Sequence, residues 1–426
     1  MQLYNALTKK KEQSVATGNA NALEDPITLY VCGITPYDTT HLGHCFTYAS
    51  FDMLIRYLEL QGYRVRYVQN VTDIDDDILG KAKEVQGNWR EVGNRWTAHF
   101  IRDMREMNVK PPDEFPRATD VIDEIIKTTA ALIRRGYAYE AAGNVYFHVD
   151  SWPEFGKLSN LPRDQMLDVA NERGNHPDDP HKKDPLDFVL WQAQAPGEPA
   201  WDSPWGPGRP GWHIECSTMA GEYLDSPVDI HGGGADLIFP HHECEIAQYE
   251  GATGKQPFVR IWMHTAMVRH EGEKMSKSLG NLVMVRDLLD KGISPDALRL
   301  CLHAHHYATA WEFDEDSLQE AAERARLLRR AATIQGGSGA ALNPRGMENT
   351  FHTAMGNDLD SPTALAALQQ YASEIISGAN AGHNVRKAQE SLRTLCGVFG
   401  LRLDQAGEQP DPAIAEGWDR YLEEFS

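Results

Sequence analysis

Residues 27–71, ITLYVCGITPYDTTHLGHCFTYASFDMLIRYLELQGYRVRYVQNV, decide the fold. Ile27–Val31 is a short apolar run of β-prone residues, and Cys32–Asp38 is rich in turn formers. His41–Leu60 then places apolar residues at helical spacing, and Tyr63–Val71 alternates like a second strand. A strand, a loop, a helix and a strand in this order predict a βαβ unit, and therefore an α/β fold built on a doubly wound parallel sheet.

The remainder of the chain predicts an insertion and a helical end. A helix over Val121–Arg135 leads into a β-rich segment punctuated by Pro and Asp, which is typical of an insertion. Strand-like runs resume at Val228–His231 and Phe258–Met263, so we expect the insertion to split the sheet. Beyond Pro295 the pattern is helical. Helices are expected at Ala297–Leu302, Ser317–Thr333, Pro362–Ser377 and Val385–Val398.

Composition excludes several classes of protein. The 426 residues are 41% hydrophobic and 24% charged, as in ordinary globular proteins of two or three domains. The net charge of −21 disfavours a protein that coats nucleic acid through its overall charge, although a local basic groove remains possible. No apolar run approaches the ~18 residues of a membrane span, and no apolar stretch follows the first lysines. We therefore expect a cytoplasmic protein without a membrane partner.

Four residues have the chemistry of a metal site. His241 and Glu245 are four apart in a predicted helix, Pro240–Tyr249, so both side chains would lie on one face. Cys32 and Cys216, each expected at a strand end beside a Gly- or Pro-rich loop, complete a donor set that suits zinc. Isolated buried cysteines and a capping histidine would give the same pattern, so the residues alone leave both interpretations open.

Two segments have the composition of anion sites. His41–His44 (HLGH) lies where the first strand passes into a helix, and the free N–H groups and the dipole of a helix start attract phosphate. Lys274–Asn281 places two lysines among small residues, as in mobile loops that neutralise phosphates. Capping histidines and a solvated loop are the structural alternatives.

Three further features have both a functional and a structural interpretation, and for the acidic run the structural one is favoured. Gly232–Gly234, between His231 and Asp236, could bring backbone close to a nucleotide, but consecutive glycines are weak evidence. The acidic run Asp73–Asp77 could hold magnesium, although a helix start also favours carboxylates. Trp212 could form a pocket wall or pack in the core.

Taken together, six segments resemble cysteinyl-tRNA synthetases and their close relatives, the ATP-dependent cysteine ligases of mycothiol biosynthesis. The segments are Tyr30–His44, Val68–Asp77, Asp184–Trp191, Arg209–Cys216, Asp229–Glu245 and Lys274–Asn281. His41–His44 is similar to the HIGH motif of class I synthetases, and Lys274–Ser278 is an intact KMSKS motif. The resemblance extends to about Leu401.

The resemblance implies a class I synthetase-type Rossmann core split by a connective insertion and followed by an α-helical C-terminal domain. The halves of the core would be residues 1–120 and 206–285, with the insertion at 121–205. A stem-contact-like region would cover 286–340, and a helical domain 341–426.

The resemblance also implies roles for individual residues. One zinc ion would be held by Cys32, Cys216, His241 and Glu245 and would bind the substrate thiolate. ATP, with Mg²⁺, would bind at Gly43, His44 and Lys277. The catalytic residues would be His41, His44, Lys274 and Lys277, which position and neutralise the reacting phosphate. Gly33, Thr72, Trp212, His231 and Asp236 would contact cysteine. The products would be cysteinyl-adenylate and pyrophosphate.

The expected acceptor is tRNA(Cys), and the alternative is the amine of glucosaminyl-inositol or another small amine. Leu279–Asn281 and Met355–Leu365 look like the synthetase, whereas Gly33–Asp38 and Met166–Pro180 look like the mycothiol ligase. Leu401–Ser426 carries two arginines against seven carboxylates, a poor surface for phosphates, and suggests a shortened form without the usual basic anticodon-reading module. We expect a monomer.

Two interpretations of other classes remain. A paralogue that binds tRNA or cysteine without ligating would not need both the KMSKS motif and a complete ligand set. A zinc hydrolase could use His242 as a ligand and Glu243 as a base, but position 246 is Ile246 and the two-histidine helix spacing of that class is missing.

Overall fold

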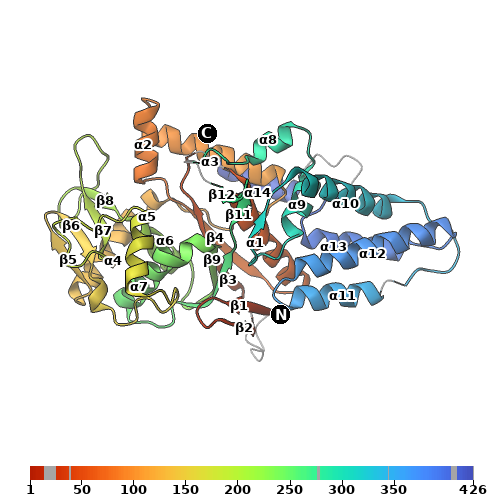
Figure 1. Cartoon of the computed structure of the whole chain (residues 1–426), viewed down its shortest axis with the longest axis horizontal. Coiled ribbons are helices and arrows are strands. Elements are labelled where there is room, and N and C mark those ends of the chain that lie inside the picture. The colour runs from red at the N-terminus through yellow and green to blue at the C-terminus, as the bar shows by residue number, and fades with distance from the viewer. Residues whose placement is uncertain (14–24, 38–39, 276–278, 344, 404–409, 426) are drawn as a thin grey trace.

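The computed structural model describes residues 1–426 except 14–24, 38–39, 276–278, 344, 404–409 and 426. Its central sheet has four strands in the order β10-β9-β3-β4, all parallel. These strands are β3 (Ile27–Ile34), β4 (Val65–Val71), β9 (Val228–Gly234) and β10 (Val259–Thr265). Because β3 pairs with β9 from beyond the insertion, the predicted split core is confirmed (Figure 1).

Helix α1 (Leu42–Leu60) packs against this sheet as the βαβ pattern predicted. Its N-cap is His41, whose Nδ1 accepts hydrogen bonds from the backbone N–H groups of Gly43 and His44. The acidic run begins the next helix, α2 (Asp76–Glu84), with Asp75 as N-cap. The helix-start interpretation of that run is therefore confirmed.

Strand β9 continues through Gly232–Gly234, beyond the run Val228–His231 that the sequence predicted as a strand. A Cβ on Gly232 would lie 2.3 Å from the Met263 carbonyl oxygen and 2.3 Å from Phe51 Cζ. Glycine is therefore needed because a neighbouring strand and α1 approach the backbone closely. The groups that lie against the Gly232 backbone therefore belong to Met263 and Phe51 of the protein.

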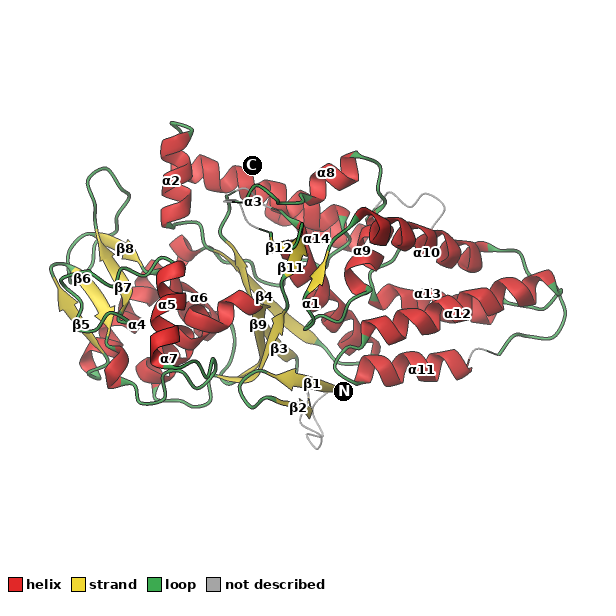
Figure 2. Ribbon diagram, in the orientation of Figure 1, coloured by secondary structure: helices red, strands yellow, loops and turns green. Residues whose placement is uncertain are grey.

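The insertion forms a separate antiparallel sheet in the order β5-β6-β7-β8 with its own helices (Figure 2). Its elements are α4 (Ile122–Arg134), β5 (Ala138–Ala141), β6 (Asn144–Phe147), α5 (Arg163–Glu172), β7 (Phe188–Ala193) and β8 (Gly208–Pro210). It has a hydrophobic core that continues beneath α6 (Trp212–Tyr223) and α7 (Glu243–Thr253).

Short elements connect these layers. They are β1 (Gln2–Asn5), β2 (Lys10–Gln13), β11 (Val268–His270), β12 (Glu273–Lys274), β13 (Trp311–Glu312), α8 (Val285–Asp290), three 3₁₀ turns (Ala118–Val121, Val149–Ser151 and Ala235–Leu237) and a π turn (Ile238–His242).

The chain beyond Pro295 is helical, as predicted, and α10 to α13 lie at the opposite end of the molecule from the insertion (Figure 1). Its helices are α9 (Pro295–His303), α10 (Glu315–Thr333), α11 (Arg345–Gly356), α12 (Ser361–Asn380), α13 (Arg386–Val398) and α14 (Pro412–Glu424). The domain boundaries proposed from the sequence stay a prediction.

The acidic end segment docks on the core. Helix α14 packs on α3 (Trp89–Glu106), with Trp418 Nε1 donating to the Val109 carbonyl oxygen at 2.7 Å. Arg105 on α3 forms an ion pair with Asp419 at 3.0 Å. One carboxylate of α14, that of Asp419, therefore has a partner within the protein.

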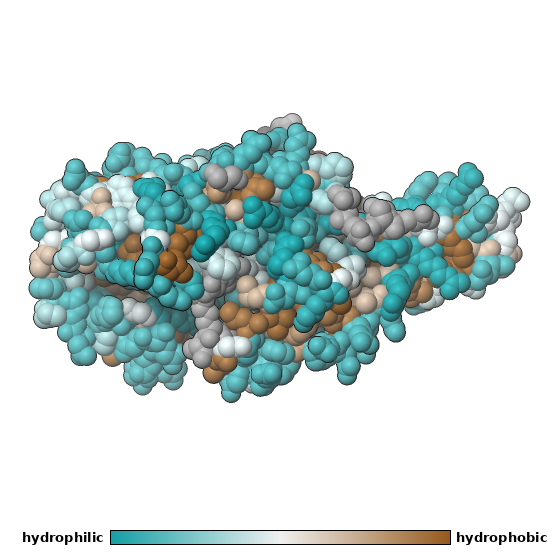
Figure 3. All heavy atoms as spheres, turned by 90° about the horizontal axis from the view of Figure 1, so that it is seen from above, coloured by the Kyte–Doolittle hydropathy of each residue, from teal (hydrophilic) through white to brown (hydrophobic). Residues whose placement is uncertain are grey.

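The outer surface is mainly hydrophilic in the view of Figure 3, with smaller hydrophobic areas between charged ones. Across the described residues, no helix is both long enough and apolar enough to cross a membrane.

Candidate functional site

A cleft of about 400 Å³ opens at the carboxyl end of β3. Its walls come from the segment after β3, the start of α1, the start of α6, the turn after β9 and strand β12. Eight of the residues predicted for the site line this cleft. They are Cys32, Gly33, His41, Gly43, His44, Trp212, Asp236 and Lys274.

Two predicted cysteine-binding residues do not line the cleft, and one predicted lysine is not among the described residues. Thr72 follows β4 and is buried, and His231 is buried within β9, and neither lines the cleft. Lys277 lies outside the described residues, whereas Lys274 of the same motif is exposed at the cleft. The roles assigned to Thr72, His231 and Lys277 stay predictions.

The four predicted metal ligands come together below the cleft. One donor atom each from Cys32, Cys216, His241 and Glu245 lies within 4.8 Å of all the others, and all four residues are buried. His241 Nε2 is 3.1 Å from Glu245 Oε1, and the Cys32 thiol donates to the same oxygen at 3.5 Å. Because Cys32 also lines the cleft, this cluster forms part of the cleft floor.

Cys216 and His241 lie on different elements from those that the sequence predicted. Cys216 is on helix α6, so its predicted position at a strand end is wrong. His241 and Glu245 do not share one regular helix, because Phe239 has extended backbone angles and Pro240 lacks an N–H group. His241 lies in the π turn and α7 begins at Glu243, and the four-residue spacing still brings the pair into contact.

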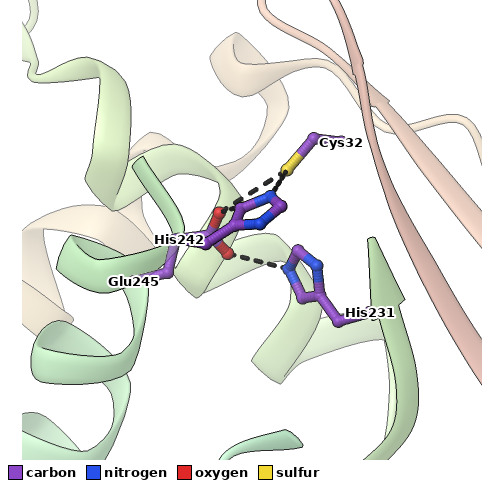
Figure 4. Close-up of side chains that lie close together, drawn as sticks. All are labelled: Cys32, His231, His242 and Glu245. Carbon is purple, nitrogen blue, oxygen red and sulfur yellow. Dashed lines mark hydrogen bonds and ion pairs between the residues drawn. The ribbon is translucent and has the colours of Figure 1, made fainter. Parts of the chain in front are cut away.

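A second group of donors shares two members with the first (Figure 4). His231 Nε2 is 2.9 Å from Glu245 Oε2, and His242 Nε2 is 3.3 Å from Cys32 Sγ. His242 is not one of the four ligands predicted from the sequence, which offered it only as a ligand of a zinc hydrolase. His231 contacts the Glu245 carboxylate and His242 contacts the Cys32 thiol, and these contacts orient both shared ligands.

The electrostatics of the cluster fit a bound cation. Burial raises the pKa of Glu245 well above its usual range and also raises the pKa of the Cys32 thiol. Burial lowers the pKa of His241, so that this imidazole stays neutral. Among the described residues, no lysine or arginine forms an ion pair with Glu245, whose recorded partners are a thiol and three imidazoles. A divalent ion would supply the missing positive charge.

Two neutral histidines, His41 and His44, line the same cleft. The rings of His41 and His44 stack with centroids 3.8 Å apart. Burial lowers the pKa of His41 to about 2, with a further contribution from His44 and an opposing one from Asp236, and burial lowers the pKa of His44 to about 4. His44 Nδ1 is buried with no hydrogen-bond partner in the described part of the chain. These rings can therefore offer hydrogen bonds to a ligand without carrying charge.

Solved structures show which class of protein has this fold. The chain is similar to the Mycobacterium tuberculosis methionyl-tRNA synthetase in complex with methionyl-adenylate, with a TM-score of 0.63 and 16% identity, over 91% of this chain and 92% of that one. The likeness shows the fold of a class I aminoacyl-tRNA synthetase, which confirms the predicted fold class.

Sequence comparison then shows the family. The chain belongs to the family described as tRNA synthetases class I (C) catalytic domain, which matches residues 19–323. It is 46% identical to an L-cysteine:1D-myo-inositol 2-amino-2-deoxy-alpha-D-glucopyranoside ligase of Thermobifida fusca over 88% of this chain and 90% of the relative. It is 42% identical to a cysteine–tRNA ligase of Dehalococcoides mccartyi over 95% and 86%, and 41% identical to that of Synechococcus elongatus over 98% and 91%. The resemblance and the predicted ligase class are confirmed.

Proposed function

We propose that this protein activates L-cysteine with ATP and transfers the cysteinyl group to tRNA(Cys). The observation that carries the proposal is the buried Cys₂HisGlu cluster, which shares Cys32 with a cleft that His41 and His44 also line. A soft metal-ligand set beside a phosphate-binding helix start suits a thiol-containing amino acid and a nucleotide. The ATP-using class I family supports this reaction type.

Cys32, Cys216, His241 and Glu245 would hold a zinc ion. Two thiols, an imidazole and a carboxyl group are a donor set that zinc accepts. When bound there, zinc supplies affinity for a thiolate, so the site favours cysteine over serine without a separate editing step. The ring centroid of Trp212, which lines the cleft, lies 4.4 Å from that of His241 in the cluster.

The protein's own groups then position the two substrates. The Asp236 carboxylate in the cleft wall suits the substrate's ammonium group. The carboxylate of cysteine attacks the α-phosphorus of ATP, the bond to the bridging oxygen breaks, and pyrophosphate leaves. His41 and His44, at the start of α1, would donate hydrogen bonds to the phosphate oxygens as charge develops. Lys274 at the cleft edge would neutralise the leaving group.

Different observations support the two candidate acceptors. The matches to cysteine–tRNA ligases reach 95% and 98% of this chain, and so include nearly all of the helical end. The match to the Thermobifida fusca ligase covers less of the chain, 88%, at the higher identity of 46%. We place tRNA first because of the coverage and keep the amine of glucosaminyl-inositol as the second candidate.

Transfer of radiolabelled cysteine tests the proposal. Zinc-loaded protein, ATP and labelled cysteine are incubated with total tRNA and with glucosaminyl-inositol in parallel, and reactions without ATP serve as controls. Label on tRNA that mild base releases, as expected for an ester, supports the proposal. Label found only on the amine, stable to base as an amide, replaces it with the second candidate. Failure of cysteine to promote exchange of pyrophosphate into ATP rules out both.

A further inference from the structure

The side chain of Arg173, which belongs to the insertion, contacts a residue of the cleft wall. This residue caps the C-terminal end of α5, and Gly174 follows it with a φ of +85° that turns the chain. Arg173 Nη1 donates to the backbone carbonyl oxygen of Asp236 at 2.6 Å and lies 3.6 Å from Asp236 Oδ2. A side chain of the insertion therefore binds the backbone of a residue in the cleft wall.

Other contacts join the insertion to the neighbouring π turn and to the start of α7. The rings of Phe155 and Phe239 meet edge to face with centroids 6.1 Å apart. The buried carboxylate of Glu243 accepts from the backbone N–H groups of Leu158 at 3.0 Å and Ser159 at 2.9 Å. These contacts hold the π turn and the start of α7, whereas Arg173 contacts a residue that lines the cleft.

The backbone of the turn that contains Asp236 sets the orientation of its carboxylate. Asp236 belongs to a single 3₁₀ turn, Ala235–Leu237, and its side chain is 41% exposed. Its Oδ1 lies 2.4 Å from the position that a Cβ on Gly234 would occupy, so the carboxylate folds back over its own turn. Its negative charge also opposes the fall in the pKa of His41 across the cleft. A small rotation of the turn would move the carboxylate away from these neighbours.

We propose that Arg173 is a positioning residue, which holds the 235–237 turn so that the Asp236 carboxylate meets the ammonium group of the amino-acid substrate. The proposal rests on the function proposed above and extends it, because it makes the insertion part of the amino-acid site. Arg173 itself does not line the cleft. It acts through Asp236, so its loss should weaken binding of cysteine and leave the nucleotide site intact.

Kinetics of cysteine-dependent exchange of pyrophosphate into ATP test this role. Arg173→Ala should raise the KM for cysteine about tenfold, as expected when one charge-assisted hydrogen bond is lost, while kcat and the KM for ATP change less than about twofold. Arg173→Lys should recover part of the loss because an ammonium group can still donate to the carbonyl oxygen. Equal changes in both KM values, or no change, would overturn the proposal.

Arg163→Ala is the matched control. Arg163 begins the same helix, is 51% exposed, and pairs with Asp150 at 3.0 Å and Asp184 at 2.6 Å within the insertion. It removes an ion-paired arginine from α5 without touching the cleft. A rise in the KM for cysteine similar to that of Arg173→Ala would show that the effect is a general loosening of α5 and would contradict the specific role.

A double-mutant cycle identifies the route of action. If Arg173 works through the carboxylate, Arg173→Ala should have no further effect on the KM for cysteine in an Asp236→Ala background. Additive effects would overturn the proposal. Hydrogen exchange gives a readout that needs no substrate: the amides of residues 234–238 should exchange faster in Arg173→Ala than in the wild type. If wild-type protein shows no cysteine-dependent exchange of pyrophosphate, the proposed function fails, and the amide measurement still decides whether Arg173 holds the turn.

Discussion

The Asp52 carboxylate on α1 forms an ion pair with the Arg299 guanidinium on α9, and both side chains are buried. Asp52 also accepts from Arg56 Nε at 2.8 Å and from the backbone N–H of Lys110 at 3.0 Å. Arg299 Nη1 donates to the Met107 carbonyl oxygen at 2.9 Å. This network fastens the helical end of the chain to the helix that begins at the cleft.

Removal of one partner should therefore be costly. Burial raises the pKa of Asp52, but Arg56 and Arg299 outweigh that effect and hold it below its usual range, so the carboxylate is charged. Asp52→Asn leaves Arg299 buried without a counter-charge, which we expect to lower the free energy of unfolding by about 3–5 kcal/mol. Urea unfolding followed by circular dichroism measures it, with the exposed Asp290→Asn as control. A double variant, Asp52→Asn with Arg299→Met, should regain stability, and no gain would contradict the explanation.

Zinc binding should depend on Cys216. Cys216→Ser replaces one of two soft ligands by a hydroxyl group, for which zinc has little affinity. We expect loss of zinc, measured by elemental analysis, and loss of cysteine binding, while ATP binding survives. Cys45→Ala, which removes a buried thiol that belongs to neither donor group, should keep the metal. Full zinc occupancy in Cys216→Ser would show that the ligand assignment is wrong.

Formation of the adenylate should depend on His44. The neutral imidazole has a buried Nδ1 without a partner in the described residues, and it stands at the helix start where a phosphate would bind. His44→Asn should slow single-turnover adenylate formation by about 10²–10³-fold with little change in the affinity for cysteine. His99→Asn, at an exposed histidine on α3, is the control. An unchanged rate in His44→Asn would contradict its proposed role.

Acid should destabilise the protein partly through His303. Burial lowers its pKa to about 3, so the native state keeps this imidazole neutral. The unfolded chain binds a proton near its ordinary value of about 6.5, so the free energy of unfolding falls as the pH drops from there toward 3. The contribution of this residue is about 1.4 kcal/mol per pH unit below about pH 6.

His303→Gln should remove that part of the slope, measured by urea unfolding between pH 7.5 and 5. His181→Gln, at an exposed histidine of the insertion, should keep the wild-type slope. Identical slopes for His303→Gln and the wild type would show that the histidine titrates in the native state as it does in the unfolded chain.

Local patterns were sufficient for much of the fold and for finding the four residues of the donor cluster. The strand Ile27–Ile34, helix Leu42–Leu60 and strand Val65–Val71 follow from hydrophobic periodicity, which depends only on neighbouring residues. The i, i+4 spacing of His241 and Glu245 kept the pair together although the π turn interrupts the expected helix. Donor chemistry selected Cys32 and Cys216, and the structure brings both to that pair.

Long-range packing decided the rest. Three features could not be predicted from hydrophobic periodicity. They are the helical position of Cys216, the placement of His231 and His242 against the donor cluster, and the contact of Arg173 with Asp236. Arg173 and Asp236 are 63 residues apart, and the docked α14 contacts residues more than 300 positions earlier. Such contacts depend on how separately folded layers pack, because burial of apolar surface is non-directional and only the assembled core selects which distant side chains meet.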